Sequence, residues 1–500
     1  MSRSLRGFLG LATLLLLGLS ASPAQAQIGA GDYAARRAAL TTQIDSGVVL
    51  AFGAPETVSH WPSFFQLPAF YYLTGFSESD AVLLMVKRGG KVTATMFVPT
   101  LSAIQERWIG ARTHVEDLQA AVGVSGRDIA ELTTAIDSLA KTELPFFVVP
   151  DVQTADYAAE DSLTRGARFL AGLRLAHPWL VARSLDDSLV RLRARKTPAE
   201  IALVRKAAEI SARAHTEAMK AAGPGCGENE IQALLEGTFR RYGGDRPGYG
   251  SIVGSGPNAT ILHYDKDERT MHDGELLLVD AATSFDHYSA DVTRTFPVNG
   301  RFTPEQREVY QIVRDAQEAF VRQIKAGVAY QTADDSGRAV VTKGLVRLGL
   351  IESADATFDP PQGMRCPSGG CSQTRLYALH GYGGHGIGLE VHDPAQYYFG
   401  PQQFAVGDVF TVEPGIYVSP DLLGALPDTP KNRTMRDKTR KAVEKYRFIG
   451  VRIEDDYALT EKGLEWLSSG VPREVSEIEA LMRQREPELP GGGSCGRSAT

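Results

Sequence analysis

The chain has 500 residues, of which 43% are hydrophobic and 23% are charged, fractions typical of globular proteins, and it contains only four cysteines. This length suffices for two or three domains, and the composition excludes a disordered, collagen-like, coiled-coil or disulfide-scaffold chain. Because 60 acidic residues outnumber 53 basic ones, the net charge is -7, and since nucleic-acid-binding proteins usually carry a basic excess, we expect no nucleic-acid partner.

The first 26 residues have the pattern of a secretory signal peptide. Arg3 and Arg6 give a positive start, an apolar run extends from Phe8 to Leu19, and Ala24-Gln25-Ala26 is a small-residue cleavage site. An apolar run this short does not span a bilayer, so we expect cleavage of residues 1–26 and export to the periplasm or the medium; an uncleaved membrane anchor is the alternative. No later stretch reaches 18 apolar residues, so we expect no stable membrane association.

Residues 30–190 are predicted to form an N-terminal domain. Apolar runs predict buried strands at Ser46–Phe52, Ala81–Val86 and Phe146–Val149, and helices are predicted at Glu116–Val122 and Arg127–Leu139. One stretch is rich in aromatic side chains, namely His60, Trp61, Phe64, Phe65, Phe70, Tyr71 and Tyr72. We interpret it as core or interface packing, with the lining of an active site as the alternative.

A second domain, residues 196–485, is predicted after a boundary near residue 195. Thr197-Pro198-Ala199-Glu200 is a capping box with proline at the first helical position, which predicts a helix that runs to about Ala222. Thr303-Pro304-Glu305-Gln306 resembles the same start signal and predicts another helix of about twenty residues. Residues 487–500 contain a Pro-Gly-Gly-Gly-Ser run and are predicted to be a disordered tail.

Four carboxylates of this second domain lie within apolar strand patterns. They are Asp280 after Leu276–Val279, Asp291 in Tyr288–Thr293, Glu413 in Phe410–Gly415 and Glu454 in Gly450–Asp455. Because an unpaired buried carboxylate is costly, each must be protonated, paired or bound to a metal. Only Arg294 and Arg452 lie close by in the sequence, and two cations do not balance four anions.

Two divalent metal ions would balance the four carboxylates, as in two-metal hydrolases. Asp280 and Asp291 are eleven residues apart, a spacing that suits neighbouring strands of one hairpin. His385 is a candidate fifth ligand, because the glycines around it let other backbone approach closely. One imidazole with four carboxylates favours a hard-to-borderline ion, Mn²⁺ first and Co²⁺, Fe²⁺ or Zn²⁺ as alternatives.

Six motifs follow one another between about residues 200 and 470. They are Asn258-Ala-Thr-Ile-Leu-His263-Tyr264, Leu278-Val-Asp280-Ala, Tyr288-Ser-Ala-Asp291-Val-Thr-Arg294-Thr-Phe-Pro, His385-Gly-Ile-Gly-Leu-Glu-Val-His392-Asp, Thr411-Val-Glu413-Pro-Gly and Arg452-Ile-Glu454-Asp. The series resembles the aminopeptidase P and prolidase branch of the pita-bread metallopeptidases. Arg36-Arg37 and Tyr72-Leu73-Thr74-Gly75-Phe76 resemble the N-terminal domain of the same family. The resemblance implies an α/β (α+β) protein, with a creatinase/aminopeptidase P-like α/β domain before the pita-bread domain.

The resemblance also implies a role for each site residue. Two metal ions would be bridged by Asp291 and Glu454, with Asp280 bound to one of them and His385 and Glu413 bound to the other. Glu413 would be the general base for an attacking water whose pKa the ions lower. His263 and His392 would contact the substrate or the developing oxyanion. Arg452 would orient the neighbouring acids, with a purely structural ion pair as the alternative.

Three features depart from the family's pattern. His380-Gly381-Tyr382-Gly383-Gly384-His385 has one residue more than the usual His-Gly-x-Gly-His, which leaves open which residue replaces the upstream histidine. Cys366 and Cys371 lie in an insertion, and in an exported protein their spacing predicts a disulfide, with free thiols as the alternative. The long segment between Glu413 and Glu454 is basic over residues 431–447; we interpret it as solvated, with a specific anionic partner as the alternative.

The activity that the resemblance implies is hydrolysis of the N-terminal Xaa-Pro bond of proline-containing peptides, by a homo-oligomer (dimer or tetramer). A prolidase restricted to Xaa-Pro dipeptides is the alternative, because sequence does not show the wall that closes the pocket. A metal-free binding protein is a remote third reading, which the intact ligand set opposes. The pattern Gly381-x-Gly383-x-x-Gly386 matches a dinucleotide-binding motif, but no βαβ unit surrounds it.

Overall fold

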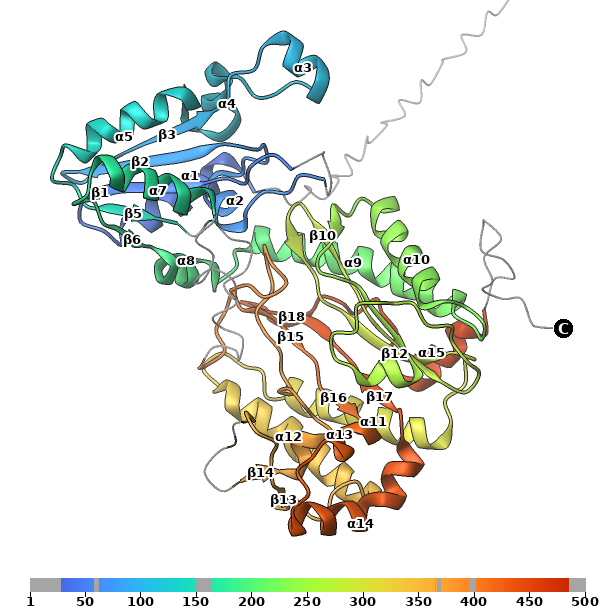
Figure 1. Cartoon of the computed structure of the whole chain (residues 1–500). Helices are drawn as coiled ribbons and strands as arrows, with labels where there is room; N and C mark the ends of the chain where they lie inside the picture. The colour runs from blue at the N-terminus through green and yellow to red at the C-terminus, as the bar shows by residue number, and fades with distance from the viewer. Residues whose placement is uncertain are drawn as a thin grey trace, which may run out of the picture.

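The structure is a computed structural model that describes residues 28–57, 63–149, 151, 164–364, 366, 370–394 and 402–484. The predicted signal peptide, the predicted C-terminal tail, His60 and Trp61 lie outside the described residues. Figure 1 shows an N-terminal unit in blue and cyan, and a larger C-terminal unit that runs from green to red. The chain passes from one to the other where helix α8 is followed by helix α9.

The N-terminal unit is built on one six-stranded sheet with the strand order β4-β3-β2-β1-β5-β6. Its strands are β1 Gly47–Phe52, β2 Val82–Arg88, β3 Lys91–Val98, β4 Ser125–Asp128, β5 Phe146–Val148 and β6 Ala182–Ser184. Its helices are α1 Ala30–Thr41, α2 Pro68–Thr74, α3 Ala103–Ile109, α4 Leu118–Val122, α5 Leu132–Ala140, α7 Arg165–Ala176 and α8 Asp186–Arg193. Every residue of β1 is buried, because helices cover both faces of the sheet.

The three strands predicted in this unit are confirmed as β1, β2 and β5, but one predicted helix begins later than expected. Residues 127 and 128 end strand β4, which pairs in parallel with β3, and helix α5 starts only at Leu132 after a short 3-10 turn. Hydrogen bonding at the sheet edge therefore outweighs the helical pattern there. The predicted helix 116–122 is confirmed as a 3-10 turn, Val115–Asp117, followed by α4.

The aromatic stretch packs where the N-terminal and C-terminal units meet. This agrees with its interpretation as core or interface packing. Tyr71 stacks on His287 of the C-terminal unit with ring centroids 3.8 Å apart, and its hydroxyl donates to Asp286 Oδ1 at 3.0 Å. The Arg246 guanidinium lies 3.4 Å from the centroid of the Phe65 ring. These contacts place the described aromatic residues between the units.

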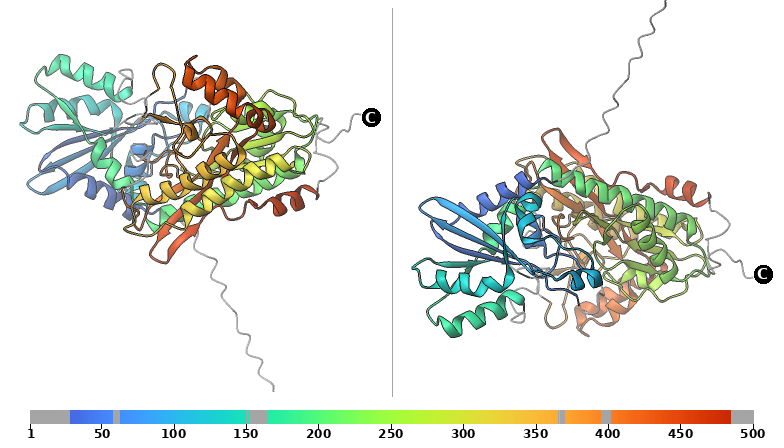
Figure 2. Two further views of the ribbon diagram at one scale, coloured as in Figure 1. Left: turned by 90° about the horizontal axis from the view of Figure 1, so that it is seen from below. Right: turned by 90° about the horizontal axis from the view of Figure 1, so that it is seen from above.

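The C-terminal unit combines small sheets of two or three strands with two long helix pairs. The helices are α9 Pro198–Ala221, α10 Glu228–Arg241, α11 Pro304–Val321, α12 Tyr330–Leu348, α13 Pro420–Gly424, α14 Pro430–Tyr446 and α15 Val475–Met482. The strands are β7 Arg246–Pro247, β8 Ile252–Ser255, β9 Leu276–Asp280, β10 Thr283–Phe285, β11 Tyr288–Ser289, β12 Thr293–Pro297, β13 Thr357–Phe358, β14 Cys371–Ser372, β15 Val409–Val412, β16 Gly415–Tyr417, β17 Gly450–Arg452, β18 Asp455–Thr460 and β19 Gly463–Trp466. Figure 2 shows α9, α10, α11 and α12 running alongside the strands, with the apolar core between these layers.

The two helix start signals are confirmed. Thr197 Oγ1 accepts from the backbone N–H of Glu200, and Glu200 Oε2 accepts from the backbone N–H of Thr197 at 2.8 Å. Thr303 and Gln306 make the same reciprocal pair at the start of α11. In both helices the free N–H groups of the first turn are therefore satisfied locally.

The long basic segment packs against the chain just before the insertion that holds Cys366 and Cys371. The side chain of Asn432 on α14 accepts from the backbone N–H of Asp359 at 2.9 Å and donates to its carbonyl at 2.8 Å. The basic side chains of this segment form ion pairs within the chain, namely Lys431–Asp359, Arg433–Asp428, Arg436–Asp428, Lys438–Glu352, Arg440–Asp437, Lys445–Glu308 and Arg447–Glu444. These pairs favour the solvated interpretation of the segment over a specific anionic partner.

Within the described part of the chain, no helix has both the length and the apolar character of a membrane span.

A disulfide joins Cys366 and Cys371, whose Cα atoms lie 5.1 Å apart, as the sequence predicted. We expect both cysteines to resist alkylation in the unfolded, unreduced protein and to react after reduction. Peptide mapping by mass spectrometry measures this, with the reduced sample as its control, and labelling of both cysteines before reduction would contradict the bond. Since the closed loop is short, reduction should cost at most about 2–3 kcal/mol of stability.

Candidate metal centre

Asp280 and Asp291 come from neighbouring antiparallel strands. Asp280 is the last residue of β9 and pairs with Thr293, the first residue of β12, while Asp291 lies two residues before β12. The predicted hairpin is thus present, although the residues between the two acids form a second hairpin of their own, β10–β11. Asp280 is close enough to Asp291 for its charge to help raise the pKa of the Asp291 carboxyl.

Glu413 and Glu454 occupy equivalent points of two adjacent strand pairs. Glu413 lies between β15 and β16, and Glu454 lies between β17 and β18. Strand β15 pairs with β18 and β16 pairs with β17, so both glutamates stand where the chain changes from one ladder to the other. The backbone N–H of Glu454 also donates to the carbonyl of Thr293 at 3.1 Å, which brings it to the strand that follows Asp291.

His385 is held against β15 by backbone hydrogen bonds. The N–H of Thr411 donates to the His385 carbonyl at 2.9 Å, and the N–H of His385 donates to Thr411 Oγ1 at 3.2 Å. A side chain at Gly384 would collide with Thr411 Oγ1 and lie 2.5 Å from Glu413 Oε1. The glycine before the histidine is therefore needed for close packing at this point.

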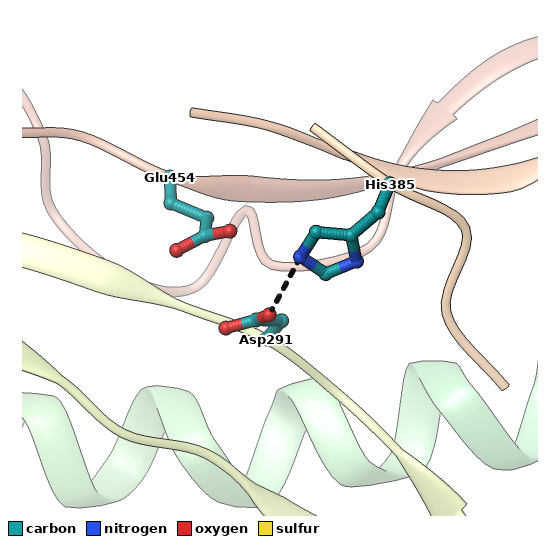
Figure 3. Close-up of side chains that lie close together, drawn as sticks. All are labelled: Asp291, His385 and Glu454. Carbon is teal, nitrogen blue, oxygen red and sulfur yellow. Dashed lines mark ion pairs between the residues drawn. The ribbon is translucent and has the colours of Figure 1, made fainter. Parts of the chain in front are cut away.

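Three of the predicted ligands converge on one point (Figure 3). Ligand atoms of Asp291, His385 and Glu454 lie within 4.8 Å of one another, and all three residues are buried. His385 Nε2 is 3.4 Å from Asp291 Oδ2 and 3.6 Å from Glu413 Oε1. Among the described residues, the buried Asp291 Oδ1 has no hydrogen-bond partner, so an oxygen donor is left free for a cation.

Asp280 lies beside this cluster and is held by two other side chains. The Tyr249 hydroxyl donates to Asp280 Oδ1 at 2.6 Å, and Arg452 Nη2 donates to Asp280 Oδ2 at 2.5 Å. Its carboxylate is therefore fixed next to Asp291 but stands outside the three-residue cluster.

The electrostatics of the site favour a bound cation. Burial, and next the charge of Asp280, raises the pKa of Asp291 well above its usual range, and burial with the charge of Asp291 does the same for Glu454. Burial also raises the pKa of Glu413 to about 8 and lowers that of His385 to about 3. The imidazole is thus neutral at neutral pH, which is its ligand form, and the crowded carboxylates repel one another unless cations lie between them.

Arg452 connects several acids of the site. Besides Asp280, its Nη1 donates to the Tyr417 hydroxyl at 2.9 Å and its Nε to Thr293 Oγ1 at 3.1 Å. Thr293 Oγ1 in turn donates to Glu454 Oε2 at 2.6 Å. One buried guanidinium therefore orients two of the predicted ligands, which supports the orienting interpretation.

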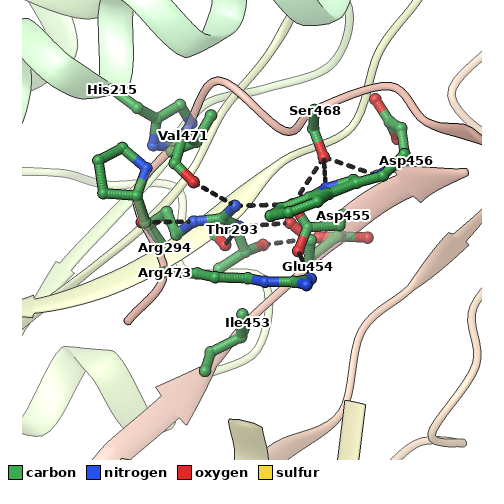
Figure 4. Close-up of polar contacts among 12 residues, drawn as sticks. His215, Thr293, Arg294, Ile453, Glu454, Asp455, Asp456, Ser468, Val471 and Arg473 are labelled. Atoms are coloured by element: carbon green, nitrogen blue, oxygen red, sulfur yellow. Dashed lines mark hydrogen bonds and ion pairs between the residues drawn. The ribbon is translucent and has the colours of Figure 1, made fainter. Parts of the chain in front are cut away.

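Arg294 pairs with Asp455 and not with the predicted ligand carboxylates, although it lies close to Asp291 in the sequence. Its Nη2 pairs with Asp455 Oδ1 at 2.7 Å, and Arg473 pairs with Asp455 Oδ2 at 2.9 Å (Figure 4). Burial opposes ionisation of Asp455, but the two cations hold the pKa of this carboxyl below its usual range. The positive charge available to the four ligand acids is therefore smaller than the sequence count suggested.

Sequence reasoning left some residues of the site unassigned. His380 Nε2 lies 3.0 Å from the Tyr417 hydroxyl and its Nδ1 lies 3.9 Å from Glu413 Oε2, so His380 is the upstream histidine that borders the site. Both carboxylate oxygens of Asp456 accept from the backbone N–H of Asp291, at 3.1 and 3.2 Å. The three adjacent acids from Glu454 to Asp456 were the sequence signal that could have indicated an acid bonded to the Asp291 backbone.

The two histidines predicted to contact substrate lie at the edge of the site. The His392 ring packs edge-on against that of His385, with centroids 4.2 Å apart. His263 is exposed and directly follows Leu262, whose carbonyl accepts from Arg452 Nη2 at 3.4 Å.

Comparison with known proteins gives matches along most of the chain. A family model described as metallopeptidase family M24 matches residues 202–461, and one described as aminopeptidase P, N-terminal domain, matches residues 33–145. A Xaa-Pro aminopeptidase of Haemophilus influenzae is 35% identical over 83% of this chain and 87% of its own, and one of Escherichia coli is 34% identical over 91% and 98%. Among solved structures, proline aminopeptidase P II from Yersinia pestis has a TM-score of 0.75 at 31% identity, covering 91% of this chain and 100% of that one. Aminopeptidase P from E. coli with the inhibitor Pro-Leu has a TM-score of 0.73 at 31% identity, covering 91% and 99%.

Proposed function

The chain belongs to metallopeptidase family M24, and on that premise we propose that it is a metal-dependent Xaa-Pro aminopeptidase, which hydrolyses the N-terminal Xaa-Pro bond of peptides and releases the first amino acid. Its fold is that of the family: an α/β protein with the aminopeptidase P N-terminal domain before a pita-bread domain. The single observation that carries the activity is the convergence of Asp291, His385 and Glu454 around a free buried carboxylate oxygen.

The donor set fits two divalent cations. Asp291, Glu454, Asp280, His385 and Glu413 would hold the ions. Four carboxylates match the charge of two such ions, and one imidazole among oxygen donors suits Mn²⁺. When bound, the ions would polarise the scissile carbonyl and lower the pKa of the attacking water.

The residues around the ions would do the rest of the chemistry. The Glu413 side chain is 18% exposed, more open than that of Asp291 at 6%, which supports a role in taking the proton of the attacking water and returning it to the leaving amine. Arg452 keeps Asp280 and, through Thr293, Glu454 in place. His392 and His263 would bind the substrate and the charge that develops on its carbonyl oxygen.

Selectivity for proline is the first test of this activity. The bond before proline is a tertiary amide without an N–H, so a protease that must hydrogen-bond that N–H cannot use it, whereas metal-assisted attack needs none. With metal-loaded enzyme, we expect kcat/KM for Xaa-Pro peptides to exceed that for Xaa-Ala peptides by about 10- to 200-fold. Equal values would refute the selectivity while leaving a metallohydrolase. The same assay with Xaa-Pro dipeptides tests the prolidase alternative, and activity on dipeptides alone would favour it.

Replacing His392 tests the second prediction. Because His392 packs against the ligand His385 at the edge of the site, we expect His392→Ala to lower kcat more than it raises KM, as for a contact made in the transition state. Steady-state kinetics on one Xaa-Pro peptide measure both constants. An unchanged kcat would remove His392 from the mechanism.

The proposal includes export and self-association. The sequence of residues 1–26 supports export to the periplasm or the medium. Helix α3 carries Ile104 and Trp108 one turn apart, and they are 73% and 85% exposed, which supports self-association; the number of copies that we propose is two or four. Light scattering on the purified protein measures this number.

A further inference from the structure

The linker between the two units, defined here as residues 193–200 from the end of helix α8 to the first turn of helix α9, carries three buried charged side chains. Arg193, Lys196 and Glu200 are 8%, 5% and 3% exposed. Connecting segments usually lie on the surface, and a buried charge is costly unless it is paired. The groups that pair with these three side chains therefore show which parts of the two units the linker connects.

Two of the three charges converge on one residue of the catalytic unit, Asp393. Lys196 Nζ donates to the Asp393 carbonyl at 2.5 Å and lies 3.9 Å from Asp393 Oδ2. Arg193 Nη2 lies 2.7 Å from Asp393 Oδ1 and 2.8 Å from Glu390 Oε2. Asp393 is itself buried and directly follows His392 in the chain.

Asp393 closes the loop that runs from His385 to His392. Its N–H donates to the Gly386 carbonyl at 2.7 Å, and its Oδ2 accepts from the N–H of Leu389 at 2.8 Å. A side chain at Gly386 would lie 2.5 Å from the Asp393 carbonyl oxygen, and one at Gly388 would lie 2.8 Å from Lys196 Cε. The glycines that follow His385 thus make room for Asp393 and for the linker lysine.

The two histidines of this loop are fixed from different sides. Thr411 of β15 bonds to His385 through both its N–H and its hydroxyl, and the N–H of Ile387 donates to the Val409 carbonyl at 3.1 Å. His385 is therefore held directly by β15, whereas Asp393 bonds to Gly386, the neighbour of His385. His392 is at the other end of the loop, next to the residue that Lys196 and Arg193 hold.

The C-terminal end of the linker, at Glu200, is held by contacts to both units. Glu200 Oε1 accepts from the Tyr288 hydroxyl at 2.9 Å and pairs with Arg36 Nη2 of helix α1 at 3.0 Å. Glu200 Oε2 meanwhile caps helix α9 through the N–H of Thr197. The linker is thus anchored at both ends of its short span, which makes it a rigid support.

We propose that Lys196 and Arg193 are positioning residues that set the place of the His392 ring through Asp393, while the place of the ligand His385 is set by β15. The inference rests on the proposed function, because the role of His392 in Xaa-Pro hydrolysis comes from there. A ring displaced by about 1 Å can cost up to about 100-fold in rate.

A double-mutant cycle tests the proposal. Lys196→Met, which keeps an unbranched apolar stem, should lower kcat about 10- to 100-fold, with little change in KM or in metal content. The double variant Lys196→Met/His392→Ala should be no slower than His392→Ala alone, because Lys196 acts only through the ring that His392→Ala already removes. Lys196→Arg should recover part of the lost rate. The matched control is Arg205→Met, which breaks a half-exposed ion pair between Arg205 of helix α9 and Glu465; this variant should behave as wild type.

A spectroscopic readout separates this proposal from the proposed function. In zinc-loaded protein with ¹³C-labelled histidine rings, Lys196→Met should shift the His392 signal, identified by its loss in His392→Ala, more than the signal of His385, whose ring it contacts. Losses that multiply in the double variant, loss of metal in Lys196→Met, or an unmoved His392 signal would overturn the proposal. If Lys196→Met does not fold, Asp393→Asn, which keeps the shape but not the charge, is measured in its place. A wild-type enzyme that cleaves no Xaa-Pro peptide would refute the proposed function instead, and the ring signals would still decide the positioning.

Discussion

Asp291→Asn is expected to abolish Xaa-Pro hydrolysis and to leave the purified protein without bound metal. A carboxylate shared between two ions, the role predicted for Asp291, would contribute to both, so its loss would weaken both sites at once, and an amide is a poor replacement for a charged oxygen donor. The fold should survive, because the backbone N–H that Asp456 accepts is unchanged and asparagine has the same shape. Elemental analysis and an Xaa-Pro peptide assay on the same preparation measure the two effects.

The stability of the metal-free protein supplies the control for Asp291→Asn. In chelator-treated wild type, Asp291 is buried beside other acids and is destabilising when charged. The variant removes that charge, so its Tm without metal should equal or exceed that of metal-free wild type, while added Mn²⁺ should raise only the wild-type Tm. Two bound ions and full activity in the variant would refute the ligand assignment.

Glu413→Gln is expected to lower kcat by about 10²- to 10⁴-fold, the usual contribution of a general base. Glutamine fills the same space and can still accept from Thr411, but it cannot take a proton from the attacking water. Steady-state kinetics at saturating metal measure the loss without confusing it with weaker metal binding.

The matched control for Glu413→Gln is Glu465→Gln. This change neutralises a glutamate whose partner, Arg205, lies on helix α9 away from the metal ligands, and it should leave kcat unchanged. A Glu413→Gln enzyme that retains wild-type kcat would exclude Glu413 as the base, even if metal binding proved normal.

The elements that could be predicted from the sequence are those that local physics determines. Capping boxes at Thr197 and Thr303 act within one helical turn, and the fully apolar run of β1 can only be a buried segment. The candidate ligand acids could be identified for a similar reason. A carboxylate within an apolar strand is unfavourable there, so its presence indicates a function.

The interactions that escaped prediction depend on pairing between distant segments. Arg294 was counted near the ligand acids, yet its partner Asp455 lies 161 positions further along the chain. The start of helix α5 was wrong because strand β3 recruits residues 127 and 128 into the sheet. Proximity in sequence therefore says little about which charges meet in a buried network.

The pairing of β16 with β17 has a consequence for how this protein can be altered. The ladder fixes Gly415 against Arg452 and Tyr417 against Gly450, so the register next to Glu413 and Glu454 is settled before the chain leaves for helix α14. A segment of any length can follow Tyr417 as long as it returns at Gly450, so the segment and not the ladder takes up a difference in length. Because this segment also contributes buried residues such as Met435 and Val443 to the core, a reporter domain is best grafted at the exposed residues Gly424 and Ala425, where helix α13 ends and where it should leave the ladder beside Glu413 and Glu454 intact.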